Sequence, residues 1–187
     1  MADTVRDLAT LQALLADNAP AQDISAQDVR DFLVSVYSDY IKVSDAKIDG
    51  TDGGAFNNGA WRTRDINTED NDTGGHCSIA SNQITLQPGT YECFIRAPAY
   101  MCALHQARLQ NVTDGLTVLI GSSVLSASAD NGYCDSVIMG SFTILAARVF
   151  EVQHRCSTTR AADGFGTANS FGLFEVYTVA EFWWHPG

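Results

Sequence analysis

The sequence predicts a mainly β protein, an antiparallel sandwich preceded by a short N-terminal helical segment; the resemblance described below makes this an antiparallel jelly-roll sandwich. Two observations predict this class. Apolar residues recur at helical spacing in the first forty residues. From residue 61 onward they alternate with polar residues, and turns rich in Gly, Asn, Asp and Pro separate the runs at the spacing of a β sandwich. No helix-length gap interrupts these runs, which argues against an α/β fold.

Two short helices are predicted before residue 43. In the first, Val5, Leu8, Leu11 and Leu15 form one apolar stripe, and the helix ends before Pro20, since proline restricts the residue that precedes it. We expect this stripe to pack on another surface, because a helix this short is marginal in isolation.

The second helix has a sharper start. Ser25 is placed to cap it, Asp28 closes a capping box, and Ile24 with Val29 forms a hydrophobic staple. The helix is expected to end at about Tyr37 or Tyr40. Its apolar stripe consists of Val29, Phe32, Leu33, Val36 and Tyr40.

Composition divides the chain into three parts. Residues 1–43 are expected to be a helical attachment segment. Residues 44–60, rich in Gly, Asn and Asp, are expected to be a linker. Residues 61–187 are expected to form the jelly-roll domain.

Strands are predicted at 83–86, 91–95, 116–120, 137–145, 149–154 and 174–184. The run from Val149 to Cys156 has one apolar face, which we expect to be buried and which consists of Phe150, Val152, His154 and Cys156.

The last strand is largely apolar on both faces. A second apolar face needs cover, and a neighbouring subunit is one natural source of it. We therefore expect an oligomer packed around this strand, with a subunit interface at Leu173, Tyr177, Val179 and Trp183.

Charge excludes some partners. The chain of 187 residues has a formal net charge of −11, which would repel nucleic acid and anionic lipid. No apolar run approaches the ~20 residues that a membrane-spanning helix needs. The first residues lack the basic stretch of a signal peptide, so neither membrane insertion nor export is expected.

The cysteines do not form an obvious framework. Their number, five, is odd, no CxxC spacing occurs, and most of them lie in apolar runs, where small core residues are found. Reduced thiols are expected, although the redox state stays open. A complete set of disulfides would need a bond to another chain.

The search for chemistry finds little, and we expect no enzyme, no cofactor and no metal. No GxSxG motif occurs. His154 lies in the predicted strand 149–154, and His105 is also expected in a strand; for both, a hydrogen-bonded structural histidine is the simpler interpretation. His76 and Cys77 resemble part of a metal site but lack further ligands at regular spacing.

An acidic run from Asp65 to Asp72 offers oxygen ligands for calcium, but Asp70 stands where an EF-hand loop requires glycine. We expect a solvated loop there, and a calcium loop of another type stays open as the alternative.

Several short motifs together resemble a known family. They are Trp61-Arg-Thr-Arg-Asp-Ile-Asn-Thr68, Leu86-Gln-Pro-Gly-Thr-Tyr91, Ala97-Pro98, His105-Gln-Ala-Arg-Leu109, Asn111-Val-Thr-Asp-Gly115, Gln153-His-Arg-Cys156, Gly164-Phe-Gly166 and Glu175-Val-Tyr177. In this order they resemble the jelly-roll domain of bacteriophage virion proteins, which is similar to tumour necrosis factor and complement globular head domains. Residues 23–33 resemble a helical segment that precedes such domains in phage fibres and spikes.

The resemblance implies a non-enzymatic homotrimer, located in the virion and made in the host cytoplasm. It implies a short spike, fibre or capsid decoration of a tailed bacteriophage that displays the jelly roll to host-surface glycans or receptors. The chain lacks the collagen-like or coiled-coil shaft of long fibres. Exposed loops at 126–135 and 157–165 are the expected ligand contacts.

Residues 1–40 are then the element that docks on other virion proteins. Its expected docking residues are Leu8, Leu11, Leu15, Val29, Phe32 and Leu33. The alternative interpretation is a secreted lectin-like or cytokine-like trimeric binding module. A glycan-active enzyme on a β scaffold is the third class, and it would need paired carboxylates across a cleft.

Overall fold

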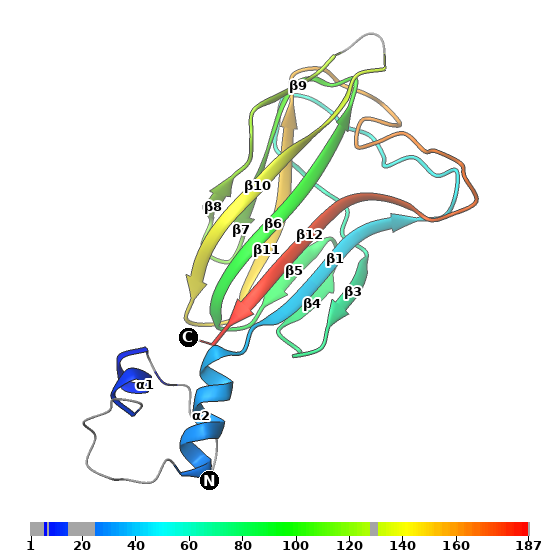
Figure 1. The fold of residues 1–187 in the computed structure, drawn as a ribbon. Coiled ribbons are helices and arrows are strands. Elements are labelled where there is room, and N and C mark those ends of the chain that lie inside the picture. The colour runs from blue at the N-terminus through cyan, green and yellow to red at the C-terminus, as the bar shows by residue number, and fades with distance from the viewer. Residues whose placement is uncertain (1–5, 7, 15–24, 128–130, 187) are drawn as a thin grey trace.

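The computed structural model describes residues 6, 8–14, 25–127 and 131–186. Two antiparallel sheets pack face to face as a sandwich, and two short helices lie at the end where β1 begins and β12 ends (Figure 1). The predicted class, a mainly β sandwich preceded by a helical segment, is confirmed.

The helices are α1, Leu8–Leu14, and α2, Ala26–Val36. The predicted capping box of α2 is present: the Asp28 amide donates to Ser25 Oγ at 3.1 Å, and the Ser25 amide donates to the Asp28 carboxylate at 3.0 Å. Tyr37 is extended and ends the helix, so Tyr40 is not on its stripe. Val5, Leu15 and Ile24 lie outside the described residues.

The five-stranded sheet has the order β10-β6-β12-β1-β3. Its strands are β1 (Asp39–Lys47), β3 (Thr68–Asp72), β6 (Gly89–Tyr100), β10 (Tyr133–Ile144) and β12 (Glu175–His185). The first strand of the domain, β1, therefore pairs with the last strand, β12, so the first and last segments of the domain lie side by side.

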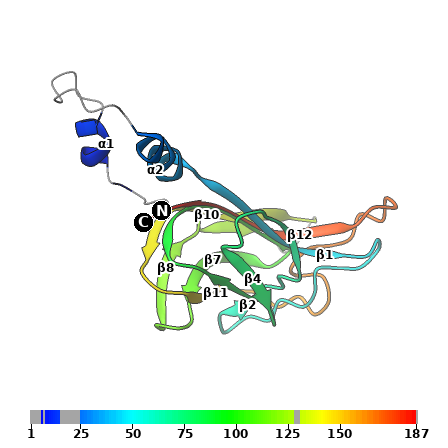
Figure 2. The same ribbon diagram turned by 90° about the horizontal axis from the view of Figure 1, so that it is seen from below.

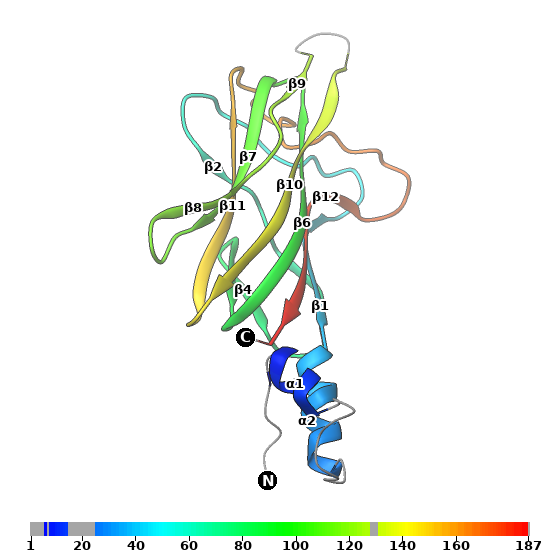
Figure 3. The same ribbon diagram turned by 60° about the vertical axis from the view of Figure 1, so that its left-hand side comes forward.

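The seven-stranded sheet has the order β4-β5-β11-β7-β8, with β2 pairing with β11 and β9 with β7. Its strands are β2 (Arg62–Thr63), β4 (Cys77–Ala80), β5 (Gln83–Leu86), β7 (Ala103–Asn111), β8 (Leu116–Ile120), β9 (Val124–Ser126) and β11 (Arg148–Cys156). Figure 2 shows the two sheets from below as two layers, and Figure 3 shows β10 and β6 side by side.

The inner faces of the two sheets form the core. On the five-stranded sheet it includes Ile41, Ile95 and Phe182, all fully buried, and the other sheet contributes Leu109 and Phe150. The predicted buried face of β11 is confirmed, because its four members, Phe150, Val152, His154 and Cys156, are all buried.

Residues 44–60 differ from the expected linker. Ser44 to Lys47 complete β1, and Phe56 is fully buried in a second core cluster. Phe56 also exchanges two backbone hydrogen bonds with Arg160, at 2.8 and 3.0 Å. Sequence composition suggested a linker between two parts of the chain, but Phe56 anchors this segment to the sandwich.

The acidic run also differs from the expected solvated loop. Thr68 to Asp72 form β3, an edge strand that pairs with β1. Asp72 accepts hydrogen bonds from the amides of His76 and Cys77, at 3.0 and 2.8 Å, and so closes the turn between β3 and β4. An edge strand explains the charges, because acidic side chains on an edge discourage pairing with another chain.

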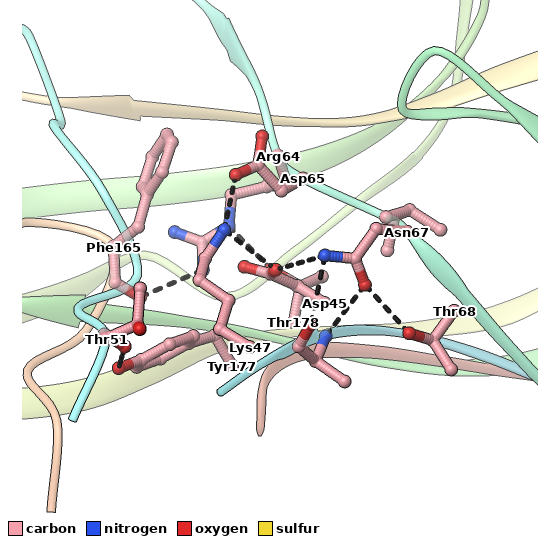
Figure 4. A network of polar contacts seen from close by, with 12 residues as sticks. Asp45, Lys47, Thr51, Arg64, Asp65, Asn67, Thr68, Phe165, Tyr177 and Thr178 are labelled. Atoms are coloured by element: carbon pink, nitrogen blue, oxygen red, sulfur yellow. Dashed lines mark hydrogen bonds and ion pairs between the residues drawn. The ribbon is translucent and has the colours of Figure 1, made fainter. Parts of the chain in front are cut away.

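A buried guanidinium ties the two sheets together (Figure 4). Arg64 is fully buried and lies just after β2, where its amide donates to Val152 of β11 at 2.8 Å. Its side chain reaches the other sheet. Nε donates to Thr178 Oγ1 at 2.6 Å and Nη1 to the Pro98 carbonyl at 3.0 Å. Burial lowers the pKa of Arg64 to about 10, so the group stays charged at neutral pH.

The same guanidinium holds the loop that follows β11. Nη2 of Arg64 donates to the Phe165 carbonyl at 3.0 Å, and the cation lies 3.9 Å above the Phe165 ring. Beside it, Lys47 bridges the carboxylates of Asp45 and Asp65 at 3.1 and 2.8 Å. Asp45 and Lys47, which lie in the expected linker, thus belong to a partly buried ionic cluster beside Arg64.

We predict that Arg64→Met lowers the free energy of unfolding by about 3–5 kcal/mol, because buried acceptors on β12, β6 and the 165 loop lose their donor. Chemical denaturation measures this change. Arg148→Met is the matched control, since Arg148 makes an exposed ion pair with Asp114 at 2.7 Å, and it should cost less than about 1 kcal/mol. Equal stability of Arg64→Met and the wild type would contradict the role given to Arg64.

Candidate subunit interface

The outer face of the five-stranded sheet carries an uncovered apolar groove. The groove is shallow, about 400 Å³, and Phe94, Met139 and Trp183 line it together with Glu92 and Ser141. These residues come from the three neighbouring strands β6, β10 and β12. Met139 lies directly opposite Phe94 in the sheet, and its side chain is 64% exposed.

Tyr40 of β1 extends this face. Its ring lies 5.6 Å from that of Trp183, and its hydroxyl donates to the Glu181 carboxylate. Burial and the neighbouring Glu181 raise the pKa of Tyr40 to about 12. The hydrogen bond therefore persists over the physiological pH range and fixes the orientation of the aromatic pair.

Of the four residues expected at the subunit interface, two are buried within the chain and two are at least partly exposed. Tyr177 and Val179 are only 5% and 6% exposed, because the chain itself covers them. The Tyr177 hydroxyl donates to the Thr51 carbonyl at 2.7 Å, and Gly166 lies against its ring. Trp183 remains partly exposed on the outer face, and Leu173 is 74% exposed in the loop before β12.

Sequence reasoning missed Phe94 and Met139. Both lie in predicted strands, on the face opposite the core residues Cys93 and Ile138. The alternation of side chains along these strands could have identified them. An apolar residue on the outward face of a strand is exposed unless another surface covers it.

Leu173 belongs to a rigid apolar tip at the other end of β12. Its exposed large side chains are Ile48, Phe171, Leu173, Phe174 and Val176, which are 51–81% exposed. Carboxylates hold the two loops of this tip in place.

Glu175 accepts hydrogen bonds from the amides of Ser170, Asn169 and Gly50, at 2.8, 3.0 and 3.3 Å. These backbone donors, that of Ser170 first, lower the pKa of Glu175. Asp49 accepts from the Gly172 amide at 3.0 Å. The apolar side chains are thus displayed on an ordered backbone.

The docking residues expected on the helices also differ in exposure. On α2, Val29, Phe32 and Leu33 are 48%, 40% and 58% exposed. Leu11 of α1 is buried. Leu8 lies in α1, but nothing of its side chain is described, and Leu15 lies outside the described residues.

The other face of α2 is polar and covered. Arg6 Nη2 pairs with Asp31 at 2.6 Å and with Asp28 at 3.2 Å, and the Arg6 amide donates to Ser35 Oγ at 2.8 Å. This arrangement leaves the apolar stripe of α2 facing outward, where it is available to another surface.

Two histidines form a buried pair rather than a reactive centre. His105 Nδ1 lies 2.9 Å from His154 Nε2, and His105 Nε2 lies 3.1 Å from the Cys134 thiol. Burial lowers the pKa of His105 to about 4 and that of His154 well below its usual value, with Arg64 acting in the same direction. Burial raises the pKa of Cys134.

Imidazole and thiol are therefore both neutral at pH 7, and the thiol is not activated as a nucleophile. The prediction that both histidines are hydrogen-bonded within the structure is confirmed. In the part of the chain that the structure describes, no three His, Cys, Asp or Glu side chains are arranged to hold a metal ion. Within the same residues, no helix is long and apolar enough to cross a membrane.

The fold is similar to solved structures of another protein. Three crystal structures of murine APRIL, at pH 8.0, 8.5 and 5.0, have TM-scores of 0.50, 0.50 and 0.52 with this chain, at 8%, 8% and 9% identity. Each comparison covers 79% of this chain and 99% of the other. The chain has a jelly-roll fold of the tumour necrosis factor type. No protein-family model and no curated protein matches it.

The buried histidine pair predicts acid sensitivity. Their pKa values are lowered in the folded chain, so between about pH 6.5 and 4 the unfolded chain binds protons that the folded chain does not, and stability falls as pH falls. The His105 proton should account for about 2 kcal/mol between pH 7 and 4.5. Urea denaturation of the wild type and His105→Gln measures this difference. Parallel pH profiles for the two proteins would contradict it.

Proposed function

We propose that this protein is a non-enzymatic homotrimer that displays three jelly-roll domains, with the outer face of the five-stranded sheet at the subunit interface. The uncovered apolar groove of Phe94, Met139 and Trp183 is the observation that carries the proposal. Patches of this kind on a folded domain mark contact surfaces. The fold type supports a trimer, because the virion, tumour necrosis factor and complement head domains that this chain resembles are expected to assemble as trimers.

The apolar tip completes the proposed interface. Leu173 and Phe174 are 74% and 72% exposed on an ordered loop, and burying them against a neighbouring copy would remove apolar area from water at ~25 cal/mol per Å². Little conformational entropy is lost in this step, since the carboxylates of Glu175 and Asp49 already fix the loop.

We further propose that the trimer is a structural virion protein of a tailed bacteriophage, a short spike, fibre or capsid decoration made in the host cytoplasm. The resemblance of residues 23–33 and of the jelly-roll motifs supports this role. The outward stripe of Val29, Phe32 and Leu33 is the proposed contact with other virion proteins. Three heads on one particle give multivalent contact with host-surface glycans, so weak single contacts add up to useful avidity.

The cysteines favour this role over a secreted binding module. All five are free, and Cys93, Cys102 and Cys156 are buried. Burial raises the pKa of Cys77 and of Cys93 to about 12, which keeps these thiols protonated. A chain with five buried or half-buried thiols and no disulfide suits assembly in a reducing compartment.

The proposed interface predicts that Met139→Glu dissociates the trimer, because a charge at the centre of the groove must be buried on association. Leu145→Glu is the matched control: Leu145 is 93% exposed in the turn after β10, away from the groove. Sedimentation velocity should give monomers for the first variant and trimers for the second. Trimers for both variants would remove this face from the interface.

The proposed attachment predicts that Leu33→Glu abolishes incorporation into phage particles while the trimer stays intact. The introduced charge lies in the apolar stripe of α2, which should be covered on the particle. Leu116→Glu, at a leucine 62% exposed on β8, is the control and should incorporate normally. Complementation of a phage lacking the protein, followed by analysis of purified particles, measures this. Normal incorporation of Leu33→Glu would contradict docking through α2.

A further inference from the structure

The outer face of the seven-stranded sheet holds a second groove, of about 610 Å³, between β7, β9 and β11. Trp61, Leu104 and Leu125 supply its apolar wall, and Gln106 and Arg155 supply polar groups. Leu104 and Leu125 are 64% and 63% exposed, so this wall is uncovered in the chain. It faces away from the five-stranded sheet and from the proposed subunit interface.

The Trp61 ring is held in place by a polar chain on the same face. Arg108 lies over the indole, with its guanidinium carbon 4.3 Å from the ring centroid. Arg108 in turn donates twice to Gln153 Oε1, at 3.0 and 2.7 Å, and once to Thr117 at 3.0 Å. Gln153 donates to Glu151 at 2.7 Å. The indole is therefore preorganised, which lowers the cost of binding a ligand against it.

Arg155 is the exception on this face. Glu151, Gln153 and Arg155 alternate outward along β11. Glu151 and Gln153 belong to the polar chain just described. The Arg155 guanidinium makes no hydrogen bond or ion pair with any residue that the structure describes, and it lies at the groove.

The charge of this groove is unusual for the chain. The protein carries a net charge of −11, yet none of the described residues that line the groove is acidic. His105, which also lines it, has a pKa lowered by burial to about 4 and contributes no charge at pH 7. Arg155 therefore gives the lining one positive charge, and no carboxylate among the described residues forms an ion pair with it.

We propose that this groove binds a carboxylated sugar, with Arg155 on the carboxylate and Trp61 against the apolar face of the pyranose ring. A guanidinium binds a carboxylate through two parallel hydrogen bonds, and an aromatic wall with few polar groups is typical of small-ligand sites. This inference rests on the proposed function, since it names the class of host-surface glycan that the trimer would contact. Each trimer would present three such grooves.

The test uses the full chain and methyl β-D-glucuronide, with methyl β-D-glucoside as the uncharged probe of the same ring. Titration by protein NMR or calorimetry should detect the glucuronide with a Kd in the millimolar range or tighter, and the glucoside at least about tenfold more weakly. Arg155→Gln and Trp61→Ala should each lose about tenfold or more in glucuronide affinity. Arg148→Gln is the control, because Arg148 lies at the other end of β11 from Arg155, outside both the groove and the proposed subunit interface, and its guanidinium pairs with Asp114.

Each other outcome overturns the proposal. These outcomes are no glucuronide binding at about 10 mM, equal affinity for both sugars, or wild-type affinity of Arg155→Gln with its thermal unfolding unchanged. Tighter binding of an acetylated dipeptide with a free C-terminal carboxylate would instead assign the groove to peptide ends. The oligomeric mass of the same samples separates the two proposals. An intact trimer that does not bind the sugar refutes this inference alone. A monomer that binds glucuronide refutes only the proposed assembly.

Discussion

The part of the sandwich around β2, the end of β6 and the start of β12 depends on the burial of one guanidinium, that of Arg64. A charge in an apolar interior is costly unless hydrogen bonds compensate it, and each of the three guanidinium nitrogens of Arg64 donates to an acceptor, on β12, on β6 or in the loop at Phe165. These acceptors belong to segments far apart in the chain. The strand ladder between β6 and β12 fixes these two strands relative to each other, and Arg64 links them to β11 and to the loop at Phe165.

The sandwich then has two outer faces of different character. The five-stranded sheet presents Phe94, Met139 and Trp183, an apolar surface without an intramolecular cover. The seven-stranded sheet presents a chain of hydrogen-bonded polar side chains that ends at Trp61, and Arg155 lies beside this chain without belonging to it. In the proposed trimer, assembly through the first face would leave the second face on the outside. The helix α2, whose apolar stripe is exposed, lies at the end where β1 begins (Figure 1), so the proposed attachment surface would be separate from both faces.

Much of the fold was predictable because the core strands alternate cleanly. The buried face of β11 follows from the sequence alone, and the capping box of α2 follows from Ser25 and Asp28. β1 was not predictable, because its polar residues Ser44 and Asp45 are buried and Lys47 is half-buried, beside partners such as Asp65 and Asn67 that no local pattern reveals. Of the residues expected at the interface, Leu173 is exposed and Trp183 partly exposed, but the burial of Tyr177 depends on contacts with Thr51 and Gly166 that no local sequence pattern reveals.

The solution mass of the full wild-type chain tests the central claim most directly. Light scattering over a range of concentrations should give three times the chain mass of 20.2 kDa, with no monomer at micromolar concentrations. A uniform mass of 20.2 kDa would contradict the account, because the apolar groove of the five-stranded sheet and the tip at Leu173 would then stay exposed to water in the protein's working state.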